Sequence, residues 1–173
     1  SYELFDNLTI KSTAYRSTFS DRLETNSEFT ATENKEIDLN AEGLENELIF
    51  KEKNQKLSVF ANFTKSKNPT NGKSQQRRPD LSYGSNYSKK FIDSVFGPFN
   101  LNINYKFTGR HSDYDGGQIM VKKTNIIDMQ LSKKIFGSLW NVNISNLLDE
   151  KYERPATYSQ DGRRLKIGYK KSY

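Results

Sequence analysis

The chain has 173 residues, of which 34% are hydrophobic and 28% charged, no cysteine, and a formal net charge of +6. The length fits one domain, and the polar composition excludes membrane-spanning helices, because no stretch approaches the roughly 18 to 20 apolar residues that such a helix needs. The lack of cysteine excludes disulfides and thiolate metal sites. The basic residues are scattered and form no nucleic-acid-binding motif, so no nucleic-acid partner is expected.

Alternation of apolar and polar residues recurs along the chain and predicts antiparallel β-strands. In chain order, the predicted strands are 8–19, 37–51, 56–66, 82–92, 99–109, 124–134, 138–146 and 162–173. Each has about 9 to 15 residues, which is at or above the ~9 to 11 that a tilted strand needs to cross a bilayer. No helix of three turns is expected.

The predicted connections alternate between short and long. The short ones are 52–55, 93–98 and 135–137, and the long ones are 20–36, 67–81, 110–123 and 147–161. Short turns on one side and long polar loops on the other are typical of a transmembrane β-barrel, with the long loops extracellular. Counting strands back from the end places residues 2–7 in a periplasmic turn.

A soluble antiparallel sandwich or barrel would show the same alternation, with its apolar face inward. Two features favour a membrane barrel instead. The polar faces are rich in Asn, Lys, Asp and Glu, and aromatic residues near the strand ends suit the girdles of a lipid-facing surface: Tyr15, Phe19, Phe99, Trp140, Tyr169 and Tyr173.

Four short motifs are similar to the end of a TonB-dependent outer-membrane receptor, a family that imports cobalamin and siderophores. They are Gly43-Leu44-Glu45, Arg77-Arg78-Pro79, the run 105–110, and the run 143–152 with its Asn-Leu-Leu-Asp-Glu-Lys-Tyr segment. The last lies one strand before the C-terminus, where the family carries it. The final residue departs from the family pattern, since Tyr173 stands where the family usually has Phe.

The resemblance implies an all-β fold, an antiparallel transmembrane β-barrel segment of about eight strands. The family has an N-terminal plug domain, a segment that engages TonB and a barrel of 22 strands. Residues 1–173 are therefore expected to be the C-terminal part of the barrel, with the plug domain absent, and to be unable to transport alone because an open sheet leaves two unpaired edges.

The function implied is that of an importer in the outer membrane of a Gram-negative bacterium. The expected partners are a metal-chelate ligand (cobalamin or a ferric siderophore), outer-membrane lipid, and TonB through the missing N-terminal part. The resemblance carries ligand-binding roles to Arg77, Arg78 and Tyr114. An arginine suits a phosphate, carboxylate or catecholate group through paired hydrogen bonds, and a tyrosine offers stacking area and a hydroxyl.

No catalytic, metal or cofactor site is expected, and the chain is interpreted as a non-enzyme. Glu45 and Glu47 lie two apart on one strand face and are interpreted as carboxylates that pair with basic residues across the barrel wall. His111 is expected in a solvated loop. The run 113–117, Asp-Tyr-Asp-Gly-Gly, is interpreted as a turn because it lacks the spaced ligands and closing Glu of a calcium loop.

Two alternatives remain open from the sequence. One is a self-contained eight-stranded outer-membrane barrel with a binding, adhesion or structural role, and the other is a soluble eight-stranded carrier. The pairing of the strand at 8–19 separates the first alternative from a receptor segment. In a closed small barrel this strand pairs with residues 163–173, whereas in a receptor segment the two edges lie apart.

Overall fold

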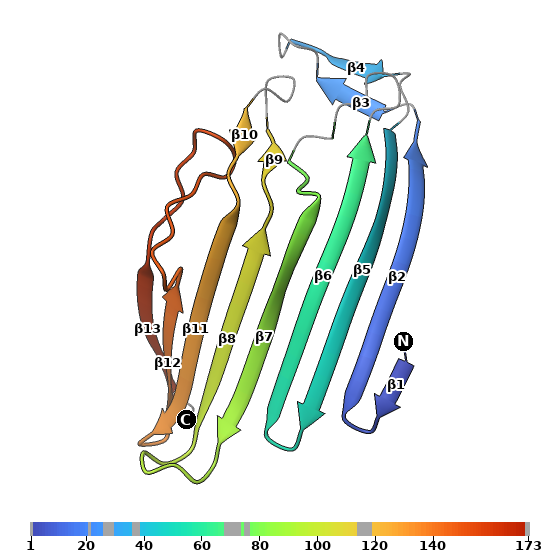
Figure 1. The fold of residues 1–173 in the computed structure, drawn as a ribbon. Helices are drawn as coiled ribbons and strands as arrows, with labels where there is room; N and C mark the ends of the chain where they lie inside the picture. Colours follow the sequence, from blue (N-terminus) through green and yellow to red (C-terminus); the bar gives the residue numbers. More distant parts are fainter. Residues whose placement is uncertain are drawn as a thin grey trace.

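The computed structural model describes residues 2–20, 22–25, 30–35, 39–67, 74, 77–113 and 119–171. In these residues every regular element is a β-strand, and none of them forms a helix that could cross a membrane. Nine strands form one antiparallel sheet in the order β1-β2-β5-β6-β7-β8-β11-β12-β13 (Figure 1).

The strands of this sheet are β1 (Tyr2–Phe5), β2 (Leu8–Phe19), β5 (Leu39–Glu52), β6 (Gln55–Lys67), β7 (Leu81–Phe91), β8 (Phe99–Thr108), β11 (Thr124–Ile135), β12 (Ser138–Ser145) and β13 (Arg164–Lys171). Two small hairpins lie in the long connections: β3 (Arg22–Thr25) with β4 (Thr32–Lys35), and β9 (His111–Ser112) with β10 (Met120–Val121). All long connections lie at one end of the sheet, here called the long-loop end, and the opposite end is the short-turn end (Figure 1).

The eight predicted strands are confirmed, with bounds that differ by at most two residues where the structure describes them; positions 37, 38, 172 and 173 lie outside the described residues. The prediction of a turn over residues 2–7 is wrong, because Tyr2–Phe5 is a ninth strand paired with β2. Only Asp6 and Asn7 form the turn. Four residues are too few to show alternation, so the segment was assigned to a turn on the basis of the adjacent Asp6 and Asn7, which favour turns.

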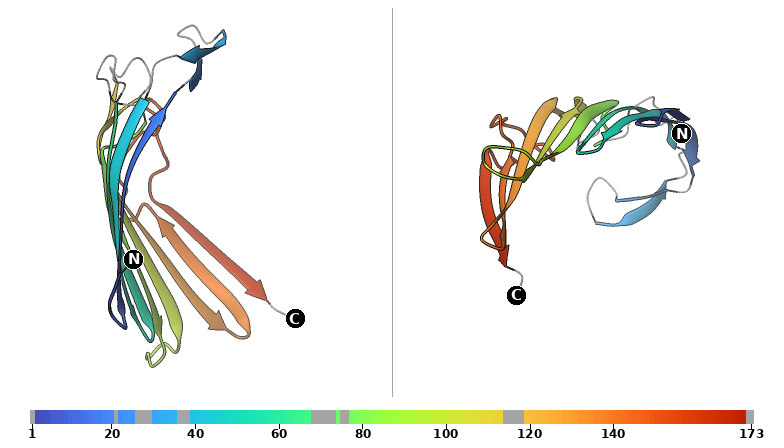
Figure 2. Two further views of the ribbon diagram at one scale, coloured as in Figure 1. Left: turned by 90° about the vertical axis from the view of Figure 1, so that its right-hand side faces the viewer. Right: turned by 90° about the horizontal axis from the view of Figure 1, so that it is seen from below.

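The sheet is curved and has a convex and a concave face (Figure 2). Because side chains alternate along a strand, the register assigns each residue to one face. Buried strand residues such as Ile49, Ser66 and Thr108 share one face, which identifies it as concave. The opposite, convex face carries exposed apolar side chains such as Leu48, Val59 and Ile167.

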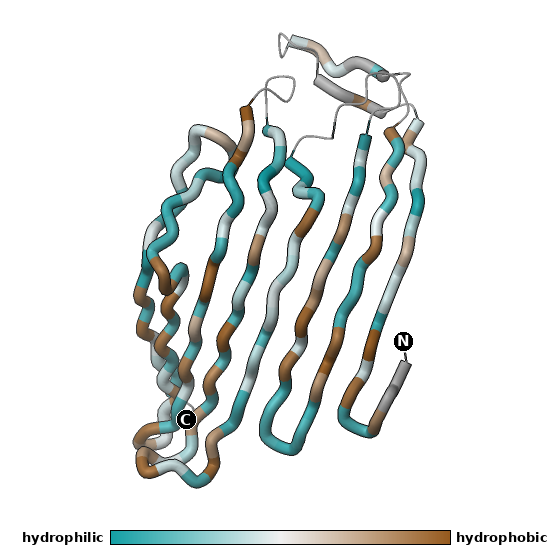
Figure 3. Tube along the Cα trace, in the orientation of Figure 1, coloured by the Kyte–Doolittle hydropathy of each residue, from teal (hydrophilic) through white to brown (hydrophobic). Residues whose placement is uncertain are grey.

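The alternation of the two faces is visible along the strands as alternating hydropathy (Figure 3). On β8 the convex face carries Leu101, Ile103, Tyr105 and Phe107, and the concave face carries Asn100, Asn102, Asn104 and Lys106. An exposed apolar surface that extends over neighbouring strands is typical of a face that contacts hydrocarbon.

Aromatic pairs lie on the convex face at the short-turn end. Phe91 stacks on Phe99 with ring centroids 4.5 Å apart, and Trp140 stacks on Tyr169 at 5.4 Å. They have the positions expected of an interfacial girdle.

The girdle prediction is wrong for Tyr15 and Phe19, which the register places on the concave face. The ring of Tyr15 lies so close to Gly43 that a Cβ there would be 2.6 Å from it, and the Tyr15 hydroxyl is 3.3 Å from Thr64 Oγ1. Tyr15 therefore packs across the concave wall. The mixed faces of the 8–19 segment concealed this orientation.

The two edges of the sheet lie apart (Figure 2). The strand Leu8–Phe19 pairs with β1 and β5, and Arg164–Lys171 pairs with β12. This is the arrangement expected of a receptor segment rather than of a closed eight-stranded barrel.

Candidate functional site

One buried carboxylate connects three loops at the long-loop end. Asp113, whose side chain is 1% exposed, accepts a hydrogen bond from Arg77 Nε at 2.6 Å and one from the Ala156 backbone N–H at 2.5 Å. These partners belong to the β6–β7 and β12–β13 connections, while Asp113 directly follows β9. A buried carboxylate needs such partners to offset its loss of hydration. We call this group the Asp113 junction.

The backbone strengthens the junction. The Arg77 N–H donates to the Ser112 carbonyl at 2.7 Å, and the Asp113 N–H donates to the Ile119 carbonyl at 2.9 Å. Arg77 has φ of 60°, a left-handed conformation that a residue with a Cβ adopts only when its surroundings hold it there. Its side chain remains 62% exposed. Arg77 is thus both a loop anchor and a guanidinium open to solvent.

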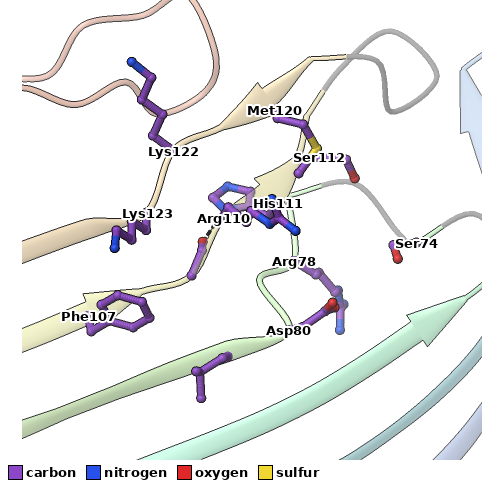
Figure 4. A pocket seen from close by; sticks show the side chains of 12 residues that line it. Ser74, Arg78, Asp80, Phe107, Arg110, His111, Ser112, Met120, Lys122 and Lys123 are labelled. Atoms are coloured by element: carbon purple, nitrogen blue, oxygen red, sulfur yellow. Dashed lines mark hydrogen bonds between the residues drawn. The ribbon is translucent and has the colours of Figure 1, made fainter.

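The neighbouring Arg78 lines a different feature, a cleft of about 1040 Å³ (Figure 4). Leu81 and Phe107 also line the cleft, and because both belong to the apolar set of their strands, the cleft opens on the convex face. We call it the convex cleft. Its charged residues are Arg78, Asp80, Arg110, Lys122 and Lys123.

Two of the three predicted ligand residues, Arg77 and Arg78, therefore belong to different features of the long-loop end. Arg77 reaches Asp113, the residue that precedes Tyr114 in the sequence, so one candidate is anchored to the segment that leads to another. Tyr114 itself lies outside the described residues. Arg78 belongs to the convex cleft, because the side chains of consecutive residues before a strand point in different directions.

The concave face is cationic. Across β2, β5–β8 and β11–β13, nine basic residues have concave register positions, against three carboxylates. The basic residues are Lys11, Lys51, Lys56, Lys90, Lys106, Lys134, Arg164, Lys166 and Lys170, and the acidic ones are Glu45, Glu47 and Asp128. The predicted cross-strand pairing is confirmed for Glu47, whose Oε2 lies 3.2 Å from Lys11 Nζ. Sequence reasoning noticed the positive charge but not how strand register divides it between the two faces.

The Asn-Leu-Leu-Asp-Glu-Lys-Tyr run forms a closed loop after β12. Asn146, buried and with φ of 51°, donates to the Glu150 carbonyl and accepts from the Glu150 N–H, both at 2.9 Å. Its own N–H donates to Asp128 Oδ1 at 2.9 Å, and Asp149 accepts from the Arg163 N–H at 2.7 Å. Asn and Asp tolerate the left-handed conformation better than other side chains with a Cβ. The motif therefore fixes where β12 ends and β13 begins.

The expectation of a solvated His111 is wrong. His111 lies in β9 and is 8% exposed, and its Nδ1 lies 3.1 Å from the Gly109 carbonyl oxygen. Asp113 is engaged in its junction, and Asp115 lies outside the described residues, as does most of the predicted turn 113–117. Within the described ranges, no group of three or more His, Cys, Asp or Glu residues could hold a metal ion.

Comparison with solved structures shows one recurrent fold. The ferric yersiniabactin uptake receptor FyuA from Yersinia pestis is similar over 96% of this chain and 26% of its own, with a TM-score of 0.77 and 17% identity. The pyoverdine outer-membrane receptor FpvA from Pseudomonas aeruginosa is similar over 96% of this chain and 27% of its own, with a TM-score of 0.76 and 13% identity. The ferric-catecholate import receptor Fiu from Escherichia coli K12 is similar over 96% of this chain and 25% of its own, with a TM-score of 0.70 and 14% identity.

No protein-family model and no curated protein matches the sequence. The chain spans about a quarter of the length of the receptors whose structures it resembles. At these identities the likeness establishes the fold. The chain has the fold of part of the β-barrel of these TonB-dependent outer-membrane receptors.

Proposed function

We propose that this chain forms part of the barrel of an outer-membrane receptor that imports an anionic ferric siderophore. The observation that supports this most directly is the cationic concave face, with nine basic residues against three carboxylates on β2, β5–β8 and β11–β13. A wall of one charge sign, enclosed in a low-dielectric barrel, concentrates ligands of the opposite sign. Catecholate and carboxylate chelates of iron carry that opposite sign.

The long-loop end would face the cell exterior and receive the ligand. The proposed loop contacts are Arg77, whose guanidinium is anchored by Asp113 but 62% exposed, and Tyr114. Arg78 is the weaker candidate, because it lines the convex cleft. Basic residues below the loops, such as Lys106 and Lys166, would then guide the chelate along the concave wall.

Residues 1–173 would supply the C-terminal part of the barrel, with a plug domain and a TonB-engaging segment in the rest of the receptor. Import would then require TonB and the proton gradient, whereas binding would not. The location in the outer membrane of a Gram-negative bacterium agrees with the apolar convex face, which suits hydrocarbon.

The test uses the complete product of the gene that encodes this chain, expressed in iron-limited cells. The probes are the ⁵⁵Fe-labelled ferric catecholate and ferripyoverdine, with labelled cyanocobalamin as a ligand of no net charge. The variant Lys106→Glu/Lys166→Glu reverses two charges on the concave face. We expect it to weaken binding of a ferric chelate about tenfold or more, since charged walls raise local ligand concentration by that order, and a protonophore to abolish uptake but not binding.

The matched control is Lys56→Glu/Lys90→Glu, which reverses two concave charges at the short-turn end. It is expected to change binding at the long-loop end far less. A receptor that binds cyanocobalamin but neither ferric chelate would contradict the proposal, and so would equal loss in the variant and its control.

A further inference from the structure

The convex cleft lies immediately above the apolar part of the convex face. Leu81 is the first residue of β7, Phe107 is the penultimate residue of β8, and both line the cleft. The four cations follow or precede the same strand ends: Arg78 before β7, Arg110 after β8, and Lys122 and Lys123 before β11. Three adjacent strands therefore place positive charge at the height where their apolar side chains stop.

These cations are available to a ligand. All four are exposed, and none of them forms an ion pair with a described residue. Among the residues that the structure describes, Asp80 is the only acidic one that lines the cleft. Four positive charges against one negative charge favour an anion, and lysine and arginine both bind phosphate well.

Apolar side chains and the backbone at Gly109 form part of the cleft surface. Gly109 is buried, and a Cβ there would be 2.8 Å from the Leu81 carbonyl oxygen, so no side chain can fill this position without moving the backbone. Leu81 supplies part of the apolar lining. Phe107 and the exposed Met120 supply the rest (Figure 4). Below them, Tyr83 stacks on Phe107 at 4.4 Å and continues the apolar surface.

A suitable occupant is thus amphipathic, with an anionic head at the cations and an apolar tail on the convex surface below. We propose that the convex cleft binds the phosphate-bearing headgroup of a lipid in the membrane leaflet at the long-loop end. Basic residues near a membrane surface attract anionic headgroups, each by roughly 1 kcal/mol, or about fivefold in affinity. The inference rests on the proposed outer-membrane location, but it does not depend on which chelate the receptor carries.

The test uses the complete receptor in phosphatidylcholine nanodiscs that contain diphosphoryl lipid A, with bound lipid counted by native mass spectrometry. The variant Arg110→Gln/Lys122→Gln/Lys123→Gln removes three cleft charges and is expected to weaken lipid A retention roughly 100-fold. Asp80→Asn removes the opposing charge and is expected to strengthen retention by about fivefold. A purely structural role for these residues would not produce effects of opposite sign.

The control is Lys106→Gln/Lys166→Gln on the concave face, which should leave lipid A retention unchanged. Unchanged retention in the triple variant would overturn the proposal, and would leave the cleft to a protein partner. Displacement of lipid A by millimolar pyrophosphate would also overturn it, because the cleft would then select a free anion rather than a lipid.

The two proposals fail in distinguishable ways. A parent protein that retains lipid A but binds no ferric chelate contradicts the proposed function alone. A triple variant that folds in the membrane, binds the chelate like the parent and retains lipid A unchanged contradicts the lipid site alone. Fractionation that finds the parent protein outside the outer membrane contradicts both.

Discussion

The convex and concave faces of the sheet differ in the chemical character of their side chains. On the convex face, apolar character recurs on neighbouring strands, and the aromatic pairs Phe91–Phe99 and Trp140–Tyr169 lie near the short-turn end. On the concave face, charged and hydrogen-bonding side chains predominate. An aromatic residue there, such as Tyr15, packs against a glycine of the neighbouring strand. The difference means that one strand pattern builds two chemically different surfaces, so a substitution must be judged by the face on which it lies.

The largest expected effect comes from a charge on the convex face. Ile103→Lys is expected to destabilise the folded barrel by about 2–4 kcal/mol, because in the proposed membrane location a lysine near the middle of the bilayer loses its hydration. Its neighbour Asn104→Lys lies on the concave face opposite Asp128 and is expected to change stability by no more than about 0.5 kcal/mol. Denaturant titration of the complete receptor in bilayers measures both, and equal destabilisation would invalidate the assignment of faces.

A smaller effect is expected where the two faces give way to loops. Asp113→Ala leaves the Ala156 N–H without its acceptor and removes the partner of Arg77 Nε. We expect a local cost of about 1–3 kcal/mol, seen as faster hydrogen exchange at Ala156. Arg77→Gln leaves the Ala156 N–H its acceptor, and is expected to speed exchange at Ala156 less than Asp113→Ala does. Similar exchange in both variants would show that the buried carboxylate is not the centre of the junction.

The smallest expected effect concerns an exposed ion pair on the concave face. Lys11 and Glu47 lie 3.2 Å apart with side chains 51% and 38% exposed. A double-mutant cycle with Lys11→Gln and Glu47→Gln is expected to give a coupling energy of at most about 1 kcal/mol, which decreases as salt is added. A larger, salt-insensitive coupling would mean that the concave wall is less hydrated than its exposure indicates.

The sequence alone predicted the strands well, because period-two alternation needs only local information. It identified eight of the nine strands of the main sheet, and the segment it missed, Tyr2–Phe5, is too short to show a period. The resemblance of the 143–152 run was similarly informative, since Asn146 closes the loop onto Glu150, only four positions away.

The candidate site was less predictable, because its contacts join residues that are distant in the sequence. Arg77 meets Asp113 and Asp113 meets Ala156 across separations of 36 and 43 residues. No pattern in the neighbouring residues indicates that Arg77 joins the Asp113 junction while Arg78 lines the convex cleft, since both are basic and exposed.

The sequence by itself determined an antiparallel, two-faced sheet with long connections at one end, since alternation and turn residues act over a few positions. Only the tertiary structure decided where the charge lies. Register and curvature place nine basic residues on the concave face and gather four more at the convex cleft. Strand pairing aligns residues that are far apart along the chain, and that alignment creates both a charged wall and a charged cleft.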